Sequence, residues 1–335
     1  MIFVILYFLL KEFKIIPHFT LLSKLEKHQK YNKAKNIMKL EPECIGCLFN
    51  QVLRALKMVK PNISHEIIIS TQKKLMNYII NMDMNKISAP IIGGYMYNLV
   101  AEMLGLKDPY EHIKEQYNQL ALKYYGEIKD IVDNAEDPLF EALAAAALGN
   151  TIDFATQHKV DLINDIQNFS SKSFKINDYN EFKRSLEKIN NTKGHLLILA
   201  DNCGEIVFDK LLVETIKKIY PKLEIIVAVR SEPIINDATM KDAENIGLTK
   251  IVKVIKSCPI PGIDLSSATE EFKKYFNKKN GIILSKGQGN FECLFGLQIP
   301  NNELYYLLKA KCVLMERIFK AKIGDLIFKK KTNDF

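Results

Sequence analysis

The predicted fold is built around HLLILADNCGEIVFD, residues 195–209. Five apolar residues, Leu196 to Ala200, lead directly into Asp201. A run this short, bounded by polar residues, is typical of a strand buried on both faces of a parallel sheet. Asn202 to Gly204 follow as a turn, and Glu205 opens an amphipathic helix. We therefore expect Asp201 at the carboxyl end of a strand and beside a helix N-terminus, where open α/β sheets bind ligands.

Asp201 and Asn202 supply neighbouring oxygen donors at this point of the chain. A carboxylate and an amide carbonyl suit a hard cation such as Mg²⁺ or Mn²⁺. The alternative is that both side chains only cap the helix that follows. The stretch by itself leaves both interpretations open.

Strand and helix candidates alternate on either side of this stretch, as in a doubly wound parallel sheet. Helices are predicted over residues 205–219 and Ile235–Ile246, and Ile323–Phe328 is a candidate edge strand. The pattern predicts a Rossmann-like three-layer α/β/α fold with a mainly parallel sheet. Its strand candidates are Leu196–Ala200, Ile225–Val229, Lys250–Ile255, Ile282–Ser285 and Leu304–Leu308.

The first half of the chain has helical periodicity and no convincing strand. An alanine-rich helix is predicted over Leu139–Leu148, and residues 156–190 look like a mixed segment of short helices. We divide the chain into an N-terminal extension (residues 1–37), a helical part (residues 38–150) and a Rossmann-like metal-binding part (residues 151–335).

The extension begins with an apolar run, Ile2 to Leu10, followed by Lys11. A bilayer span needs about 18 residues or more. The run has no basic flank or cleavage site of a secretory signal. It is either a surface or packing helix or an extension from an upstream start codon, and we favour the second because Met38 begins a stretch that resembles a natural start. We expect a cytoplasmic protein without stable membrane insertion.

Composition narrows the class of partner. The 335 residues are 47% hydrophobic, enough for a substantial core, and the net charge is +8. The lysines are spread among acids rather than gathered in runs, so nucleic-acid binding is not expected. The same surplus of positive charge suits a small anionic or phosphorylated metabolite.

Six cysteines are scattered along the chain, which is not the pattern of a disulfide framework. Only Cys44 and Cys47 are close in sequence, one helical turn apart. They are either two small buried apolar residues or a soft-metal or redox site.

Polar clusters follow several of the strand candidates. Arg230 to Asp237 follow one strand, Lys286 to Asn290 follow another, and Lys309 to Lys311 follow a third. The carboxyl ends of parallel strands meet at one edge of a sheet, so these groups should gather there. Acids for a divalent metal, with lysine and glycine-loop amides for phosphoryl oxygens, are the equipment for phosphoryl transfer to water.

With these motifs assembled, residues 38–330 resemble the damage-control phosphatase family, long known only as a domain of unknown function. The Cys-x-x-Cys pair and the Lys-Gly-Gln-Gly-Asn loop point to its small single-unit subfamily. The resemblance rests on CIGC (44–47), GNTIDF (149–154), DNCGE (201–205), RSEP (230–233) with Asn236-Asp237, KGQGN (286–290) and LKAKC (308–312).

The resemblance implies a helical part packed on a Rossmann-like part, and a phosphatase that uses Mn²⁺, Ni²⁺, Co²⁺ or Mg²⁺. Asp201, Asn202 and Asp237 correspond to the metal ligands. The implied substrate contacts are Asn150, Asp153, Lys309 and the phosphate loop formed by Lys286, Gly287, Gly289 and Asn290. Lys309 matches the lysine of the family's Arg-Thr-x-Lys motif, but Tyr306 and Leu307 replace its Arg and Thr.

The expected reaction is metal-assisted hydrolysis of a phosphomonoester of a small metabolite, such as a sugar phosphate or a damaged metabolite. Asp201 and Asp237 act with the metal, and Asp153 or Glu205 is the candidate base. A covalent phosphate on Asp201 ranks second, because a metal-ligating carboxylate is a poorer nucleophile. The alternatives are an S-adenosylmethionine-dependent carboxyl methyltransferase and a non-catalytic metabolite-binding protein.

Overall fold

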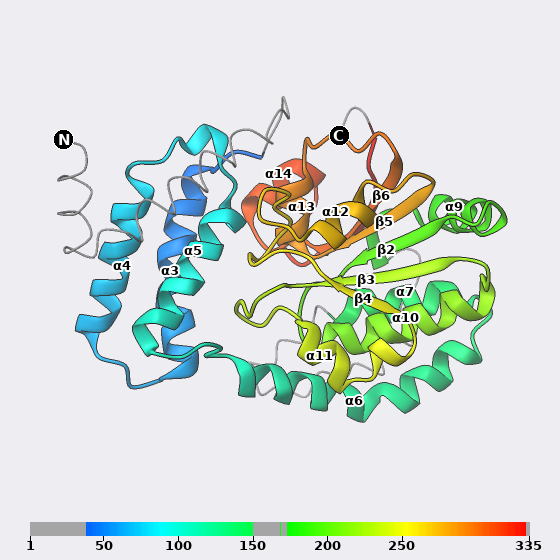
Figure 1. Ribbon diagram of the computed structural model, residues 1–335, viewed down its shortest axis with the longest axis horizontal. Helices are drawn as coiled ribbons and strands as arrows, with labels where there is room; N and C mark the ends of the chain where they lie inside the picture. Colours follow the sequence, from blue (N-terminus) through cyan, green and yellow to red (C-terminus); the bar gives the residue numbers. More distant parts are fainter. Residues whose placement is uncertain (1–37, 150–167, 169–172, 333–335) are drawn as a thin grey trace, which may run out of the picture.

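The structure, a computed structural model, describes residues 38–149, 168 and 173–332. A seven-stranded sheet lies between two layers of helices, and a group of three helices stands beside it at one end of the molecule (Figure 1). The expected Rossmann-like α/β/α architecture, preceded by a helical part, is confirmed. The strands are β1 (Phe174–Asn177), β2 (His195–Leu199), β3 (Glu224–Val229), β4 (Lys253–Lys256), β5 (Gly281–Lys286), β6 (Asn302–Lys309) and β7 (Leu326–Lys330).

The order of the strands is β1-β7-β6-β5-β2-β3-β4. Neighbours from β6 to β4 are parallel, whereas β7 is antiparallel to β6 and parallel to β1. The chain builds outward from β2 through β3 to β4, then returns to place β5 on the other side of β2. The carboxyl ends of β2 and β5 therefore form the switch point of the sheet, the position at which ligands bind in such folds.

Two hydrophobic cores lie on the two faces of the sheet because side chains alternate along each strand. In β2, Leu196 and Ile198 face one core, and Leu197 and Leu199 face the other. The first core lies under α7 (Pro138–Leu148), α9 (Tyr179–Asn191), α10 (Glu205–Ile219) and α11 (Met240–Asn245). The second lies under α12 (Glu270–Phe276), α13 (Gln288–Leu294) and α14 (Val313–Phe319).

The alanine-rich helix α7 packs closely on α10. Ala144 to Ala147 are all buried, and small side chains let the two helix axes approach. At the end of α7, a Cβ placed on Gly149 would lie 2.9 Å from Cδ2 of Phe208 and 3.3 Å from Cα of Glu205. This contact brings the end of α7 to the first turn of α10.

The helices α3 (Pro42–Val59), α4 (His65–Ile79) and α5 (Ala89–Leu104) share a third core. That core includes Ile234 from the loop after β3. A Cβ on Gly94 of α5 would lie 2.5 Å from Cγ2 of Ile260, which follows β4. The helical group is thus seated on loops at the carboxyl edge of the sheet. None of the helices in residues 38–149 and 173–332 is long and apolar enough to span a membrane.

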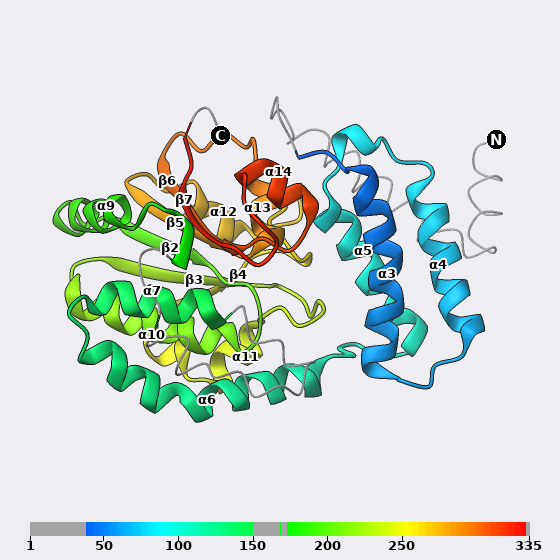
Figure 2. The same ribbon diagram turned by 180° about the vertical axis from the view of Figure 1, so that it is seen from behind.

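Helix α6 (Glu111–Asp133) links the helical group to the α/β unit. Figures 1 and 2 show it running outside α7 and α10, and its Ala121, Ile128 and Val132 join the first core. The packing therefore puts α6 and α7 with the α/β unit, whereas the sequence pattern placed them in the helical part. The division at residue 150 stays a prediction.

Three local predictions were wrong. The strand at Ile323–Phe328 is β7, which lies inside the sheet between β6 and β1 rather than at its edge. The mixed segment 156–190 contains β1 and one long helix, α9, where it is described. The helix predicted over Ile235–Ile246 begins only at Met240, because Thr239 and Asp242 form a capping box there.

Candidate active site

The loops after β2 and β3 are joined to each other along their backbones. Asn202 and Asp237 form an isolated antiparallel bridge. The N–H of Ala238 donates to the carbonyl of Asp201 at 2.8 Å, and the N–H of Cys203 donates to that of Asn236 at 2.8 Å. The three residues expected to bind a metal, Asp201, Asn202 and Asp237, are therefore brought together at the switch point.

Neither Asp201 nor Asn202 caps the following helix through its side chain. Helix α10 has Gly204 as its N-cap, with a φ of 84° and no side-chain cap hydrogen bond. The side-chain amide of Asn202 instead donates to Oδ2 of Asp201 at 2.9 Å and to Oε1 of Glu205 at 2.8 Å. The structure therefore does not support the interpretation of the pair as simple caps.

Arg230, which directly follows β3, pairs with two of these acids. Its side chain is 1% exposed; Nε donates to Oδ2 of Asp237 at 2.6 Å, and Nη2 lies 3.6 Å from Oδ1 of Asp201. Nη1 donates to Oδ1 of Asn290 and to the carbonyl of Gly262, each at 2.9 Å. Arg230 belongs to the RSEP motif, but the sequence analysis predicted no role for it. Its position directly after a buried strand could have indicated a place in the site.

Two residues of the loop expected to bind phosphate, Gly289 and Asn290, contact other parts of the protein closely. The side-chain amide of Asn290 is fully buried; it accepts from Arg230 and donates to the carbonyl of Lys286 at 2.7 Å. Gly289 packs against the carbonyl of Pro261, where a Cβ would overlap it. Asn290 and Gly289 therefore support the site from behind.

Gly287 is placed directly against Asp201. Its φ of +80° is disfavoured for residues with a side chain, and a Cβ there would overlap the Asp201 carboxylate. Its N–H donates to the carbonyl of Leu307 at 3.0 Å, so that donor serves the sheet rather than an anion. Glycine is needed here because the backbone approaches a functional carboxylate.

Lys286 lies between two acids of α10. It is 1% exposed, with Nζ 3.3 Å from Oε2 of Glu205 and in an ion pair with Asp209. Although burial favours the neutral amine, these carboxylates raise the pKa of Lys286. Sequence reasoning missed Asp209, which the i, i+4 spacing from Glu205 on one helix face could have indicated.

Burial makes two of the acids easy to protonate. It raises the pKa of Glu205 to about 7 against the opposing effect of Lys286, and it raises the pKa of Asp237 to about 7 against that of Arg230. The charge of Asp201 contributes in the same direction to both. Lys311 opposes these shifts, so its ammonium acts on the site from the loop after β6.

The charge balance and donor chemistry of this cluster fit a divalent cation. Four carboxyl groups, of Asp201, Glu205, Asp209 and Asp237, lie beside two cations, Arg230 and Lys286, an excess of two negative charges when all are ionised. In the described part of the chain, no three His, Cys, Asp or Glu side chains already converge as a metal site. A site here must accordingly include another oxygen donor, and the Asn202 amide adjoins both Asp201 and Glu205.

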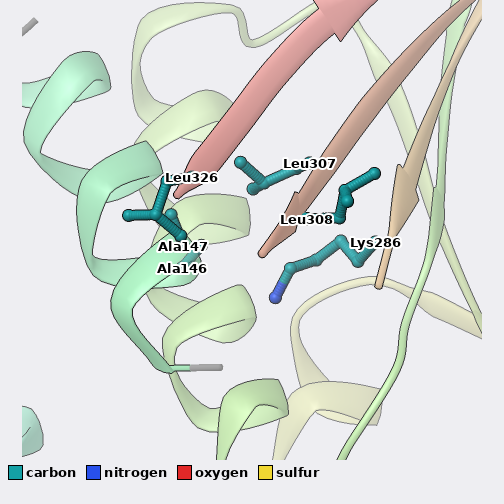
Figure 3. Close-up of a pocket in the computed structure, with 6 residues that line it drawn as sticks. All are labelled: Ala146, Ala147, Lys286, Leu307, Leu308 and Leu326. Atoms are coloured by element: carbon teal, nitrogen blue, oxygen red, sulfur yellow. The ribbon is translucent and has the colours of Figure 1, made fainter. Parts of the chain in front are cut away.

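Of the remaining predicted substrate contacts, Lys309 lies within the described residues. Lys309 lies half-buried at the end of β6, the strand next to Lys286, and Figure 3 shows the Lys286 amine pointing into a hollow beside the end of α7. The hollow is otherwise lined by apolar residues of α7, β6 and β7. Asn150 and Asp153, predicted to reach in from beyond α7, lie outside the described residues.

Cys44 and Cys47 lie in the first turns of α3. Burial raises the pKa of Cys44 to about 11, which disfavours a reactive thiolate. The Sγ atom of Cys47 accepts a hydrogen bond from Nε2 of Gln51 at 3.2 Å. These surroundings favour a structural role for Cys44.

A parallel sheet with buried acids at its switch point defines an α/β protein with a ligand site at the strand ends. The damage-control phosphatase ARMT1-like domain matches residues 40–327, and the chain belongs to this family.

Three archaeal relatives match along nearly their whole length. The damage-control phosphatase PH1575 of Pyrococcus horikoshii is 33% identical over 296 residues, 87% of this chain and 97% of the relative. A damage-control phosphatase of Archaeoglobus fulgidus is 31% identical over 301 residues, 87% of this chain and 99% of the relative. Protein MJ0202 of Methanocaldococcus jannaschii is 30% identical over 299 residues, 88% of this chain and 96% of the relative.

The fold also matches a solved structure. The crystal structure of the DUF89 family protein of Pyrococcus horikoshii superimposes with a TM-score of 0.75 at 28% identity. The match covers 88% of this chain and all of that one. The family relation therefore extends to the whole arrangement of helical part and sheet.

Proposed function

We propose that this protein is a metal-dependent phosphatase that hydrolyses phosphomonoesters of small metabolites, such as sugar phosphates or damaged metabolites, in the cytoplasm. The observation that carries the proposal is the buried cluster of four acids and two cations at the switch point. Two relatives are named damage-control phosphatases, which supports the reaction class. Within the family, we assign the chain to the Cys-x-x-Cys subfamily on its Cys44–Cys47 pair.

Asp201, Asn202 and Asp237 would hold the divalent ion, Mn²⁺, Ni²⁺, Co²⁺ or Mg²⁺. When bound, such an ion polarises a phosphoryl oxygen and lowers the pKa of a water molecule. The amide nitrogen of Asn202 faces two carboxylates, so this side chain must turn over to present its oxygen. Arg230 keeps Asp201 and Asp237 at a fixed separation, because its guanidinium contacts both.

Glu205 is the proposed base within the described residues. Its carboxyl is 2.8 Å from Asn202 and 3.3 Å from Lys286, and a pKa of about 7 lets it exchange a proton near neutral pH. Asp153 stays the other candidate. Lys286, with Lys309 at the end of β6 and Lys311 in the loop after it, would offset the negative charge of the phosphoryl group.

The experiment is phosphate release from a panel of sugar phosphates and p-nitrophenyl phosphate. The protein is treated with EDTA, and Mn²⁺, Ni²⁺, Co²⁺ or Mg²⁺ is added back singly. We expect EDTA to stop turnover and at least one metal to restore it. Folded protein that releases no phosphate with any of the four metals would refute the proposal, and methyl transfer from S-adenosylmethionine or ligand binding without turnover would then be tested.

A further inference from the structure

Two polar side chains of α6 are buried behind the proposed metal ligands. Lys114 and Asn118 lie one helical turn apart, and each is 3% exposed. Burying polar groups is costly unless each is hydrogen-bonded or paired. The contacts of these two side chains therefore indicate what they do.

Asn118 contacts the turn that follows Asn202 and the first turn of α11, the helix that follows the loop carrying Asp237. Its Oδ1 accepts the N–H of Gly204 at 2.7 Å, two residues beyond Asn202. Its Nδ2 donates to Oδ1 of Asp242 at 3.3 Å. One side-chain amide from a third element thus links the turn after β2 to the segment after β3.

Asp242 is in turn hydrogen-bonded to Thr239, in the segment that follows Asp237. Its Oδ2 accepts from the N–H of Thr239 at 2.9 Å and from the Thr239 hydroxyl at 2.6 Å, two residues beyond Asp237. Lys114 balances the charge, with Nζ 2.5 Å from Asp108 and 3.7 Å from Asp242. The network is made of buried, mutually satisfied groups.

The turn at Gly204 depends on this link. Gly204 is the N-cap of α10, and no side chain of its own loop caps the helix. Instead, the side-chain oxygen of Asn118, on helix α6, accepts the hydrogen bond from the Gly204 N–H. Loss of that acceptor would leave a buried donor unpaired at the start of α10, so the turn would move or open.

We propose that Asn118 is a positioning residue that fixes Asn202 and Asp237 relative to each other and so sets the affinity for the divalent ion. The inference rests on the proposed function, since it assumes that these loops hold a metal. Groups behind metal ligands that fix their orientation typically change metal affinity by about 10- to 100-fold when they are removed.

The test is Mn²⁺ affinity of the full chain, followed by the EPR signal of free Mn²⁺, without any substrate. Asn118→Leu keeps the approximate volume and removes both hydrogen bonds. Asn118→Asp keeps the acceptor for Gly204 but sets a carboxylate against Asp242. We expect each to weaken Mn²⁺ binding about tenfold or more.

A charge-swapped pair supplies the rescue. In Asn118→Asp combined with Asp242→Asn, the new amide at 242 donates to the new carboxylate at 118, and the Gly204 and Thr239 bonds are kept. We expect the exchange to restore most of the Mn²⁺ affinity lost in Asn118→Asp, because the effects of substitutions at two contacting residues are coupled rather than additive. A role confined to global stability would leave the Mn²⁺ affinity of the folded single variants unchanged, so there would be no loss for this exchange to reverse.

Ser185→Ala is the matched control. Ser185 is buried on α9 and hydrogen-bonds to Glu303 at 2.7 Å and to Tyr305 at 2.9 Å, away from the acid cluster. It should lower thermal stability without changing Mn²⁺ affinity. Amide hydrogen exchange at Gly204 adds a metal-free readout, with protection lost in Asn118→Leu and kept in the swapped pair.

The outcomes separate the two proposals. Wild-type protein that binds none of Mn²⁺, Ni²⁺, Co²⁺ and Mg²⁺ would overturn the metal assignment and this inference with it. Wild-type binding with unchanged affinity in Asn118→Leu would overturn the positioning role alone. If Asn118→Leu does not fold, Asn118→Asp and the swapped pair decide, and failure of the swap to restore affinity counts against the inference.

Discussion

Gly287→Ala should disturb Asp201 directly. The residue has φ +80° and ψ 158°, a region occupied almost only by glycine, so an alanine there costs about 1–3 kcal/mol of strain. The added Cβ also overlaps the Asp201 carboxylate, and overpacking of this kind costs about 1–3 kcal/mol more. Together these give roughly 2–6 kcal/mol, a large share of the 5–15 kcal/mol typical of folded proteins.

Gly105→Ala is the control for backbone strain. Gly105 also has a positive φ, +68°, but nothing lies within 4 Å of the position of its Cβ. It should cost about 1–2 kcal/mol, from the left-handed backbone alone. Urea unfolding and Mn²⁺ titration of both variants separate strain from displacement.

We expect Gly287→Ala to lose more stability than Gly105→Ala and, unlike it, to bind Mn²⁺ more weakly. The second effect is the informative one, because it requires the carboxylate of Asp201 to move. Equal stability losses in the two variants, together with wild-type Mn²⁺ affinity in Gly287→Ala, would show that the glycine is not needed for the approach to Asp201.

Three further predictions concern the site and its support. Asp201→Ala should abolish metal-dependent phosphate release while the fold stays intact by circular dichroism. The control Asp137→Ala, which removes contacts to Lys183 and Tyr179, should keep phosphate release. Full activity in Asp201→Ala would refute the assignment. Burial raises the pKa of Glu292 from 4.5 to about 7, so the folded state binds this proton more tightly than the unfolded chain does. The free energy of unfolding that this proton contributes is fully present below pH 4.5 and is lost as the pH rises through 7. Glu292→Gln should therefore gain stability relative to wild type on the order of 3 kcal/mol between pH 4.5 and pH 8 in urea unfolding, and a pH-independent difference would contradict the reasoning. Ala145→Leu should destabilise the protein by about 1–3 kcal/mol, because Ala145 is fully buried in the core that α7 and α10 share and a larger side chain overpacks it; an unchanged urea midpoint would show that this core has room to spare.

Strands and helices with a strong apolar pattern could be predicted from the amino-acid sequence. The helix over residues 205–219 was predicted at its observed bounds, and the strand predicted over Leu196–Ala200 lies one residue earlier, at His195–Leu199. An amphipathic helix leaves a periodic apolar pattern and a fully buried strand leaves a continuous apolar run, and both can be recognised in the sequence. Placing polar residues after parallel strands also predicted that Asp201, Asp237 and Lys286 would meet. The rule about strand ends needs only the order of elements along the chain.

Short or irregular elements were not predicted correctly, because they depend on contacts that the local sequence pattern does not contain. The four-residue strand β1 exists as a partner of β7, and its sequence alone carries little pattern. The start of α11 depends on the Thr239–Asp242 capping box, which competed with an apolar run that looked helical from Ile235 onward. Local pattern cannot rank such competing possibilities.

The three-dimensional structure alone decided what each polar residue does. Asn290 has the sequence context of a phosphate loop, yet its amide is occupied by Arg230 and backbone carbonyls. Asn118 sits in an ordinary amphipathic helix, yet it hydrogen-bonds to the turn after β2 and to helix α11, both more than eighty positions further along the chain. Residue type and spacing predict where a side chain begins, whereas hydrogen-bond partners and burial depend on segments distant in sequence, so roles assigned by contact became visible only in the folded chain.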